Sequence, residues 1–193
     1  MQTTTKTQRF GLQRYFLLWV TLSFLGWVFE TLFVFVAFGK WNNQGFLRLP
    51  VCPIYGSSLM SMFWLAGTPD APRGLLKNVE NRLLRYGLYA LLAFIVPSIA
   101  EFAVGFILDK GFDTWLWDYS GFAFNVMGYV CVPVSIVWMA LIFPFMKFIF
   151  PRIRAAIGKI PTALSWGIAI AILAALGVDF LTSTINRLQG GII

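Results

Sequence analysis

Five long apolar stretches, separated by short segments with charged residues, glycine and proline, dominate the chain. They cover about residues 15–38, 51–67, 83–108, 122–150 and 162–188. A helix that crosses a bilayer needs about 17–25 mostly apolar residues. The pattern therefore predicts an all-α fold: a polytopic integral membrane protein with five transmembrane helices, forming a single transmembrane domain over residues 1–193.

The composition agrees with a membrane location. Hydrophobic residues make up 59% of the chain and charged residues only 12%, whereas a soluble domain has roughly 25% charged residues. The first apolar stretch is too long for the core of a signal peptide, and no small-residue cleavage site follows it. We therefore expect this stretch to stay in the membrane as an anchor.

Lysine and arginine are distributed unevenly among the connecting segments. Eleven lie before the first stretch, after the second, or around the end of the fourth, and four lie elsewhere. Because cytoplasmic loops carry an excess of basic residues, this pattern places the amino terminus inside the cell and the carboxyl terminus outside. The eleven are Lys6, Arg9, Arg14, Arg73, Lys77, Arg82, Arg85, Lys147, Arg152, Arg154 and Lys159; the four are Lys40, Arg48, Lys110 and Arg187.

The net charge of +7 is explained by this orientation and by contact with anionic membrane lipids. No soluble basic surface is expected, so nucleic acid is excluded as a partner. The connections 68–85 and 151–161 predict short amphipathic helices at the inner headgroups. Docking of a cytoplasmic partner is the alternative role for them.

The absence of histidine narrows the chemistry. A chain with no histidine and two cysteines has no imidazole for proton relays, for serine or cysteine catalytic pairs, or for haem and zinc sites. Two cysteines in apolar surroundings favour inert packing over reactive thiolates. We expect no cofactor and no metal site.

Carboxylates inside the apolar stretches are the strongest indication of function. Glu30 and Glu101 lie about nine and eight residues before the outer ends of their stretches, and Asp179 is similarly placed in the last one. At 1.5 Å per residue, the two glutamates lie roughly 12–15 Å below the outer ends. Ionisable groups at such depth are costly and are usually functional. Alternatively, each is a neutral acid or pairs with a cation such as Arg48 or Lys110.

Each glutamate is followed by the same signature, W-x-x-x-G-F. It covers residues 41–46 after Glu30 and residues 117–122 after Glu101, and a Cys beside a Pro follows each copy. The order of features predicts a parallel repeat, with one half at about 15–67, the other at about 83–150, and an extra helix at about 162–188. Chance similarity is the alternative, because aromatic residues make up 18% of the chain.

Prolines and polar residues flank these positions. Pro97 lies four residues before Glu101, and Pro133 interrupts the fourth stretch; broken helices beside carboxylates are typical of binding sites in transporters. Asp118 is expected to cap the fourth helix, with Asn125 near the same start. Asn43 is placed to cap a turn. Trp41 and Trp117 suit an aromatic belt at the membrane interface or the mouth of a pocket.

The chain resembles a known family in several of these motifs. They are Gly-Trp-Val-Phe-Glu at 26–30, Pro-Val-Cys-Pro-Ile-Tyr-Gly at 50–56, Trp-Asp-Tyr-Ser at 117–120 and Asn-Val-Met-Gly at 125–128. They are similar to motifs of the bacterial "putative ABC-transporter type IV" membrane family, over about residues 26–133. Gln44, Leu49 and Tyr129 stand where that family usually has Arg, Gly and Arg. The resemblance implies a permease of the bacterial cytoplasmic membrane. With no Walker motif in the chain, any ATPase must be a separate subunit.

These observations predict a permease-like protein that binds or moves a small solute through an outward-facing polar cavity. Glu30 and Glu101 would bind a cationic group or carry coupling protons. A homodimer or a separate ATPase subunit is plausible for so small a permease. The alternatives are a membrane-embedded enzyme acting on a lipid-linked substrate, and a non-catalytic scaffold or sensor. The candidate solute-binding residues are Glu30, Glu101, Asp118, Asn125, Arg48, Tyr55, Asn43, Trp41 and Trp117.

Overall fold

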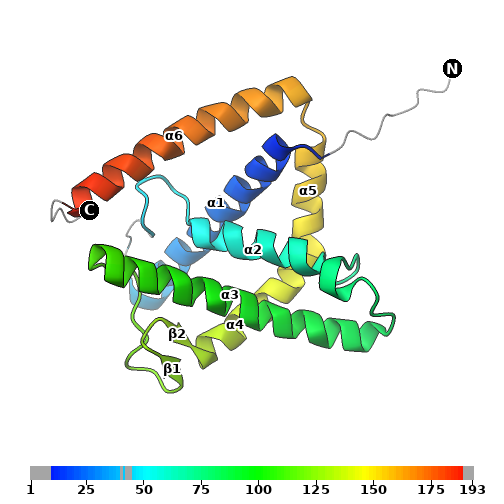
Figure 1. Cartoon of the computed structure of the whole chain (residues 1–193), viewed down its shortest axis with the longest axis horizontal. Coiled ribbons are helices and arrows are strands. Elements are labelled where there is room, and N and C mark those ends of the chain that lie inside the picture. The colour runs from blue at the N-terminus through cyan, green and yellow to red at the C-terminus, as the bar shows by residue number, and fades with distance from the viewer. Residues whose placement is uncertain (1–9, 40, 42–44, 189–193) are drawn as a thin grey trace.

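The computed structural model describes residues 10–39, 41 and 45–188. Helices make up most of this part of the chain (Figure 1). They are α1 (Leu12–Phe38), α2 (Pro53–Ala66), η1 (Gly74–Leu76), α3 (Arg82–Phe112), α4 (Val132–Pro144), η2 (Phe145–Ile149), α5 (Phe150–Gly158) and α6 (Thr162–Leu188), with two short strands, β1 (Asn125–Val126) and β2 (Val130–Cys131).

Four helices are long and apolar enough to cross a membrane. They cover Leu12–Val36, Arg82–Phe112, Val132–Gly158 and Thr162–Arg187. The second predicted stretch forms the 14-residue helix α2, which is about 21 Å long and shorter than a hydrocarbon core of about 30 Å. The structure therefore supports four spanning helices, and a fifth crossing by α2 stays a prediction.

The fourth predicted stretch is wrong in its first ten residues. Residues 122–131 form an antiparallel hairpin in which Asn125 pairs with Cys131 and Val126 with Val130, and the helix begins only at Val132. Phe124, Met127 and Gly128 have positive φ, a conformation that no helix accepts. Pro133 lies in the first turn of α4, where it has no helical hydrogen bond to break. It therefore starts this helix and does not interrupt it.

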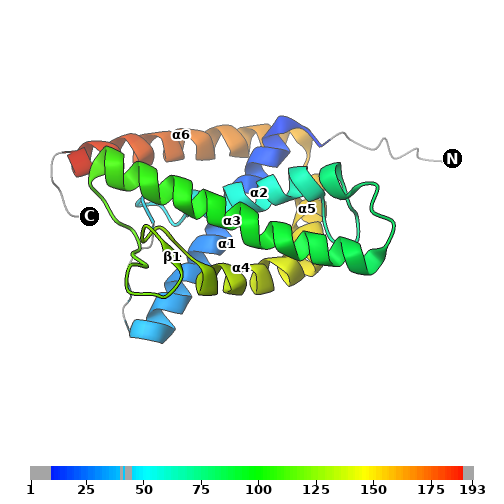
Figure 2. The same ribbon diagram turned by 60° about the horizontal axis from the view of Figure 1, so that its bottom comes forward.

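Of the two amphipathic helices predicted at the inner surface, the one in residues 151–161 forms and the one in residues 68–85 does not. The connection after α2 contains only the three-residue η1, preceded by a tight turn bridged between Gly67 and Pro72. The segment 151–161 is largely α5, which continues from α4 through the π-helix η2. The chain turns sharply at η2 in both views (Figures 1 and 2). A π-turn inside a helix is a common cause of such bends.

The helices alternate in direction between two ends of the molecule. In Figure 1, α1, α3 and α6 run from the right-hand end towards the left, and α2 and α4 run back. The start of α1, the α2–α3 connection and α5 therefore gather at one end, and the hairpin and the end of α3 lie at the other (Figures 1 and 2). The first end carries most of the described basic residues.

The largest apolar core lies between α1, α2, α3 and the α4–α5 helix. Leu18 and Leu22 of α1, Met62 of α2, Tyr89 of α3 and Met146 of η2 are fully buried there. The α1–α2 crossing is close because both helices carry a glycine at it. An added Cβ on Gly26 would lie 2.3 Å from Cγ of Tyr55, and one on Gly56 would lie 2.6 Å from the Trp19 carbonyl oxygen.

Arg14 is not a solvated base before the first helix, as the charge count assumed. It lies in the first turn of α1 and is only 2% exposed. Its guanidinium donates to the Ile160 carbonyl oxygen at 2.8 Å and to Oγ1 of Thr162 at 3.3 Å. Arg14 therefore ties the start of α1 to the α5–α6 connection.

We expect Arg14→Met to destabilise the fold by about 2 kcal/mol, because a charged hydrogen bond to a buried acceptor contributes roughly 1.5–3 kcal/mol. The measurement is unfolding of the detergent-purified protein, followed by tryptophan fluorescence. Lys159→Met, at an exposed position of the same connection, is the control and should change stability by less than about 0.5 kcal/mol. Equal midpoints for Arg14→Met and the unaltered protein would contradict this role.

Candidate functional site

Glu101 of α3 is a buried carboxylate with one satisfied oxygen. It is 7% exposed, and its Oε1 accepts a hydrogen bond of 2.7 Å from Nε1 of Trp138 on α4. Its Oε2 is buried and has no hydrogen-bond partner among the described residues. A buried carboxylate oxygen without a partner is costly, so this oxygen is suited to a ligand or a proton.

Glu30 of α1 faces the start of α2. Its Oε2 accepts from the Cys52 thiol at 3.5 Å, and the Tyr55 side chain lies near the same carboxylate. Cys52 immediately precedes the first residue of α2, and Tyr55 lies in the first turn of that helix. The close α1–α2 crossing at Gly26 is what brings the Tyr55 ring to Glu30, one helical turn away from the glycine.

The two carboxylates share neighbours and so belong to one cluster. Trp138, which donates to Glu101, packs its ring against that of Tyr55 at the start of α2, and Cys52 beside that start donates to Glu30. Tyr119 lies in the connection between α3 and β1, where burial and the nearby charges of Glu101 and Glu30 raise its pKa. Four helices and this connection thus contribute to the site.

Aromatic rings surround the carboxylates. The Trp138 ring contacts the Tyr55 ring edge-to-face at a centroid distance of 5.5 Å and the Phe29 ring at 5.9 Å. Together with Tyr119, these rings form an apolar wall around two negative groups. We call Glu30, Glu101, Cys52, Tyr55, Trp138 and Tyr119 the carboxylate cluster.

Asp118, Asn125 and Trp117 use their polar atoms within the connection that leads into the hairpin. The prediction that Asp118 caps the fourth helix is wrong, because that helix starts at Val132 and Oδ1 of Asp118 instead accepts from the Ser120 amide at 2.8 Å. Hydrogen bonds from the Ser120 side chain and amide lower the pKa of Asp118.

The other two residues also stabilise this connection. Asn125 donates to the Phe122 carbonyl oxygen at 2.8 Å and accepts from the Gly128 amide at 3.1 Å. The indole of Trp117 donates to the Tyr129 carbonyl oxygen at 2.9 Å. The three side chains shape the connection that carries Tyr119 and do not contact the carboxylates through any hydrogen bond the structure describes.

Arg48 lies beside Asp179, the third carboxylate of the apolar stretches. A cavity of about 570 Å³ is lined by Arg48, Leu49, Asp179, Thr182 and apolar residues of α6. Asp179 is 8% exposed and accepts from the Leu49 amide at 3.0 Å. Asp179 thereby ties α6 to the segment before α2.

Trp41 and Asn43 contribute no contact to the cluster that the structure describes. Trp41 is 66% exposed and packs its ring against Phe35, with centroids 5.5 Å apart. This exposure is typical of an aromatic side chain at a membrane interface. Asn43 lies outside the described residues.

Sequence reasoning missed the role of Trp138. It lies within a uniformly apolar run, with no motif beside it, and only the packing of α4 on α3 shows that its indole reaches Glu101. Tyr119 and Cys52 were also missed as neighbours of the glutamates. The available signal was the W-x-x-x-G-F signature, because Tyr119 lies within its second copy and Cys52 follows its first.

The described residues contain no group of three or more Cys, Asp or Glu side chains that could hold a metal ion. A site with two carboxylates, hydroxyl groups and aromatic rings instead suits an organic cation or protons. Aromatic faces attract ammonium groups, and carboxylates supply the opposite charge.

Comparison with known families gives the context of this site. A family model described as "Putative ABC-transporter type IV" matches residues 17–184, whereas no solved structure matches the chain. The match includes both glutamates and extends from α1 to α6. The family and the long apolar helices together fit a membrane protein of transport-like type. The chain therefore belongs to the "Putative ABC-transporter type IV" family.

Proposed function

We propose that the protein is a permease-like membrane protein that binds the cationic group of a small organic solute at the carboxylate cluster. One observation carries this proposal. Glu30 and Glu101 come from different helices and meet the same group of aromatic neighbours, and no lysine or arginine of the described chain pairs with either. Two like charges in a poorly solvated site need a cation or protons to be stable.

The surroundings favour an organic cation. The unpartnered Oε2 of Glu101 offers one contact, and the rings of Tyr55, Trp138 and Phe29 offer polarisable faces. A desolvated cation over an aromatic ring gains roughly 2 kcal/mol. In the absence of solute, protons would occupy the carboxylates, so that binding of solute and release of protons are coupled.

The proposed orientation follows from the basic end of the molecule. Cytoplasmic segments are enriched in lysine and arginine, which places the α2–α3 connection and α5 inside and the carboxylate cluster nearer the outer surface. The protein would then lie in the bacterial cytoplasmic membrane with its amino terminus inside and its carboxyl terminus outside. A second copy or a separate ATPase subunit would supply the remaining machinery for transport.

The test measures binding of tetramethylammonium and choline to the detergent-purified protein by isothermal titration calorimetry. Loss of one charged contact corresponds to roughly 10–100-fold weaker binding, and we expect this loss for both Glu30→Gln and Glu101→Gln. The control is Glu80→Gln, which removes the only other glutamate and lies exposed in the α2–α3 connection. It should bind as the unaltered protein does.

Three results would contradict the proposal. The first is unchanged affinity in both glutamine variants. The second is no binding by the unaltered protein, together with no cationic molecule retained in native mass spectrometry. The third is a modified lipid that accumulates only when both glutamates are present, because it would support the enzyme alternative instead.

A further inference from the structure

Two arginines at the basic end converge on one aromatic ring. The guanidinium carbon of Arg73 lies 5.1 Å from the centroid of the Phe63 ring, and that of Arg154 lies 5.3 Å from it. Arg73 precedes η1, Phe63 lies near the end of α2, and Arg154 lies in α5. Two like charges are thus held together by residues from three elements.

Neither guanidinium has an anionic partner in the described part of the chain. The structure gives these two side chains contacts with aromatic rings, but no ion pair and no hydrogen bond to another group. Nε of Arg154 is buried and has no hydrogen-bond partner among the described residues. A buried N–H group is costly when it is unpaired, and the neighbouring Arg73 is exposed, so the pair is accessible to an anion from outside the chain.

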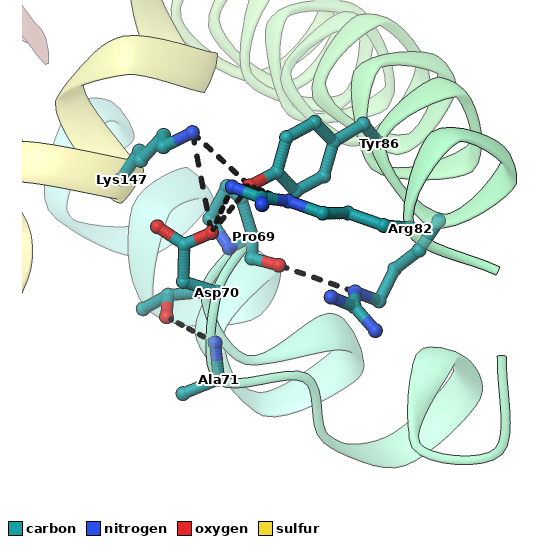
Figure 3. Close-up of polar contacts among 8 residues, drawn as sticks. Pro69, Asp70, Ala71, Arg82, Tyr86 and Lys147 are labelled. Carbon is teal, nitrogen blue, oxygen red and sulfur yellow. Dashed lines mark hydrogen bonds and ion pairs between the residues drawn. The ribbon is translucent and has the colours of Figure 1, made fainter. Parts of the chain in front are cut away.

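The neighbouring basic residues, in contrast, have hydrogen-bond or ion-pair partners within the protein. Figure 3 shows a cluster in which Asp70 lies between Lys147 and Arg82, and the Tyr86 hydroxyl accepts from both cations and donates to Asp70. Arg85 donates to the Pro69 carbonyl oxygen at 3.3 Å. These cations are satisfied within the protein. The contrast distinguishes Arg73 and Arg154 from a generally basic surface.

A cavity of about 150 Å³ opens beside the two arginines. The residues that line it are Phe63, Thr68, Ala71, Arg73, Phe150, Pro151, Arg154 and Ala155. A water molecule occupies about 30 Å³ in the liquid, so the space holds about five waters or one phosphate group. The Thr68 hydroxyl accepts from the Ala71 amide and keeps its own proton to donate.

Exposed apolar side chains flank this cavity in the sequence. Trp64 and Leu65 follow Phe63 and are 61% and 41% exposed, and Phe148 and Ile149 precede Phe150 and are 52% and 46% exposed. The segments that line the cavity therefore also carry exposed apolar side chains suited to contact acyl chains, and they lie at the end of the molecule where α2 ends and α3 begins (Figures 1 and 2).

We propose that Arg73 and Arg154 form a binding site for the phosphate group of an anionic membrane phospholipid, with Thr68 as an additional donor. Arginine suits this role because its planar guanidinium can bind phosphate through two hydrogen bonds while stacking on a ring. The site is independent of the carboxylate cluster, since none of its residues belongs to that cluster.

The experiment is native mass spectrometry of the full chain in detergent, titrated with phosphatidylglycerol, with phosphatidylcholine and separately with inorganic phosphate. We expect phosphatidylglycerol to bind most tightly, and Arg73→Gln and Arg154→Gln each to weaken it about tenfold, the change that corresponds to about 1.4 kcal/mol. Arg154→Lys should restore only part of the affinity, because lysine lacks the fork of donors. The matched control is Arg152→Gln: Arg152 is exposed two residues away and donates to the Phe148 carbonyl oxygen, so its loss should change the affinity less than twofold.

Three results would overturn the inference. One is unchanged affinity for phosphatidylglycerol in both arginine variants. Thermal midpoints equal to that of the unaltered protein would show that the variants compared are folded. Another is binding of phosphatidylcholine as tight as that of phosphatidylglycerol. The third is arginine-dependent binding of inorganic phosphate without binding of phosphatidylglycerol, which would identify a site for a soluble anion.

Discussion

Gly26→Ala is expected to lower the stability of the fold by about 1–3 kcal/mol, as overpacking of a close contact does. The added methyl group would lie 2.3 Å from Cγ and 2.4 Å from Cβ of Tyr55. Because Cβ is fixed to the α2 backbone, rotation of the Tyr55 ring cannot relieve the clash. The two helices must separate, and the buried contacts of Leu22 and Met60 at this crossing must loosen with them.

Gly87→Ala provides a matched control. Gly87 also lies within a long helix, α3, but nothing lies within 4 Å of its added Cβ. Alanine in an exposed helix interior is more favourable than glycine by about 1 kcal/mol, so the two substitutions should change stability in opposite directions. The measurement is the midpoint of thermal unfolding in detergent. Equal midpoints for the two variants would show that the α1–α2 crossing is not tight.

The same substitution reports on the site. Separation of α1 and α2 would move Tyr55 and Cys52 away from Glu30, so we expect Gly26→Ala to bind tetramethylammonium more weakly even where the protein remains folded. Gly87→Ala should retain its affinity. Stability and binding are linked here because one glycine determines both the packing of α2 and the surroundings of Glu30.

The sequence was informative where a single residue conflicts with its surroundings. Glu30 and Glu101 were identifiable because a carboxylate in an apolar stretch has few inexpensive places to lie. This expectation rests on a strong local physical constraint, and in the structure the two glutamates share the neighbours of one cluster.

The sequence was less informative where tertiary contacts decide. Residues 122–131 are apolar enough to continue a helix, but the structure has a hairpin there with Phe124 and Met127 at positive φ. Arg14 was assigned to a solvated segment, yet it is buried against the α5–α6 connection. Hydropathy measures the average character of a segment. It does not show which polar groups will form hydrogen bonds with a segment that is distant in the sequence.

The two halves of the proposed repeat agree at their cysteines and prolines but differ around their glutamates. Cys52 and Cys131 each immediately precede the first residue of a helix, α2 and α4 respectively, and a proline lies in the first turn of both. The glutamates nevertheless have different partners, a thiol for Glu30 and an indole for Glu101. Duplication stays a prediction, and the differing partners indicate that the two carboxylates would not act identically.

The largest effect on binding is expected when Glu30 and Glu101 are replaced together, and its size distinguishes one shared site from two. If both carboxylates contact the same cation, the first replacement already removes most of the charge attraction. Each single variant is expected to lose roughly 10–100-fold in affinity for tetramethylammonium. The second replacement, in the double variant Glu30→Gln/Glu101→Gln, should then cost less than about a further tenfold. The losses of binding free energy from two residues that contact one ligand do not add, whereas the losses from two independent sites add within about 0.5 kcal/mol.

Trp138→Phe extends the same comparison to the partner of Glu101. Phenylalanine keeps the ring contacts with Tyr55 and Phe29 but removes the indole N–H that donates to Oε1 at 2.7 Å. The indole holds the Glu101 carboxylate in place, so its loss leaves that carboxylate less well positioned for a cation. We therefore expect Trp138→Phe to weaken binding in the unaltered background and to have no effect once Glu101 is glutamine. Two results together would contradict a shared cation site. The losses of binding free energy from Glu30→Gln and Glu101→Gln would add, and Trp138→Phe would have the same effect with glutamate or glutamine at position 101.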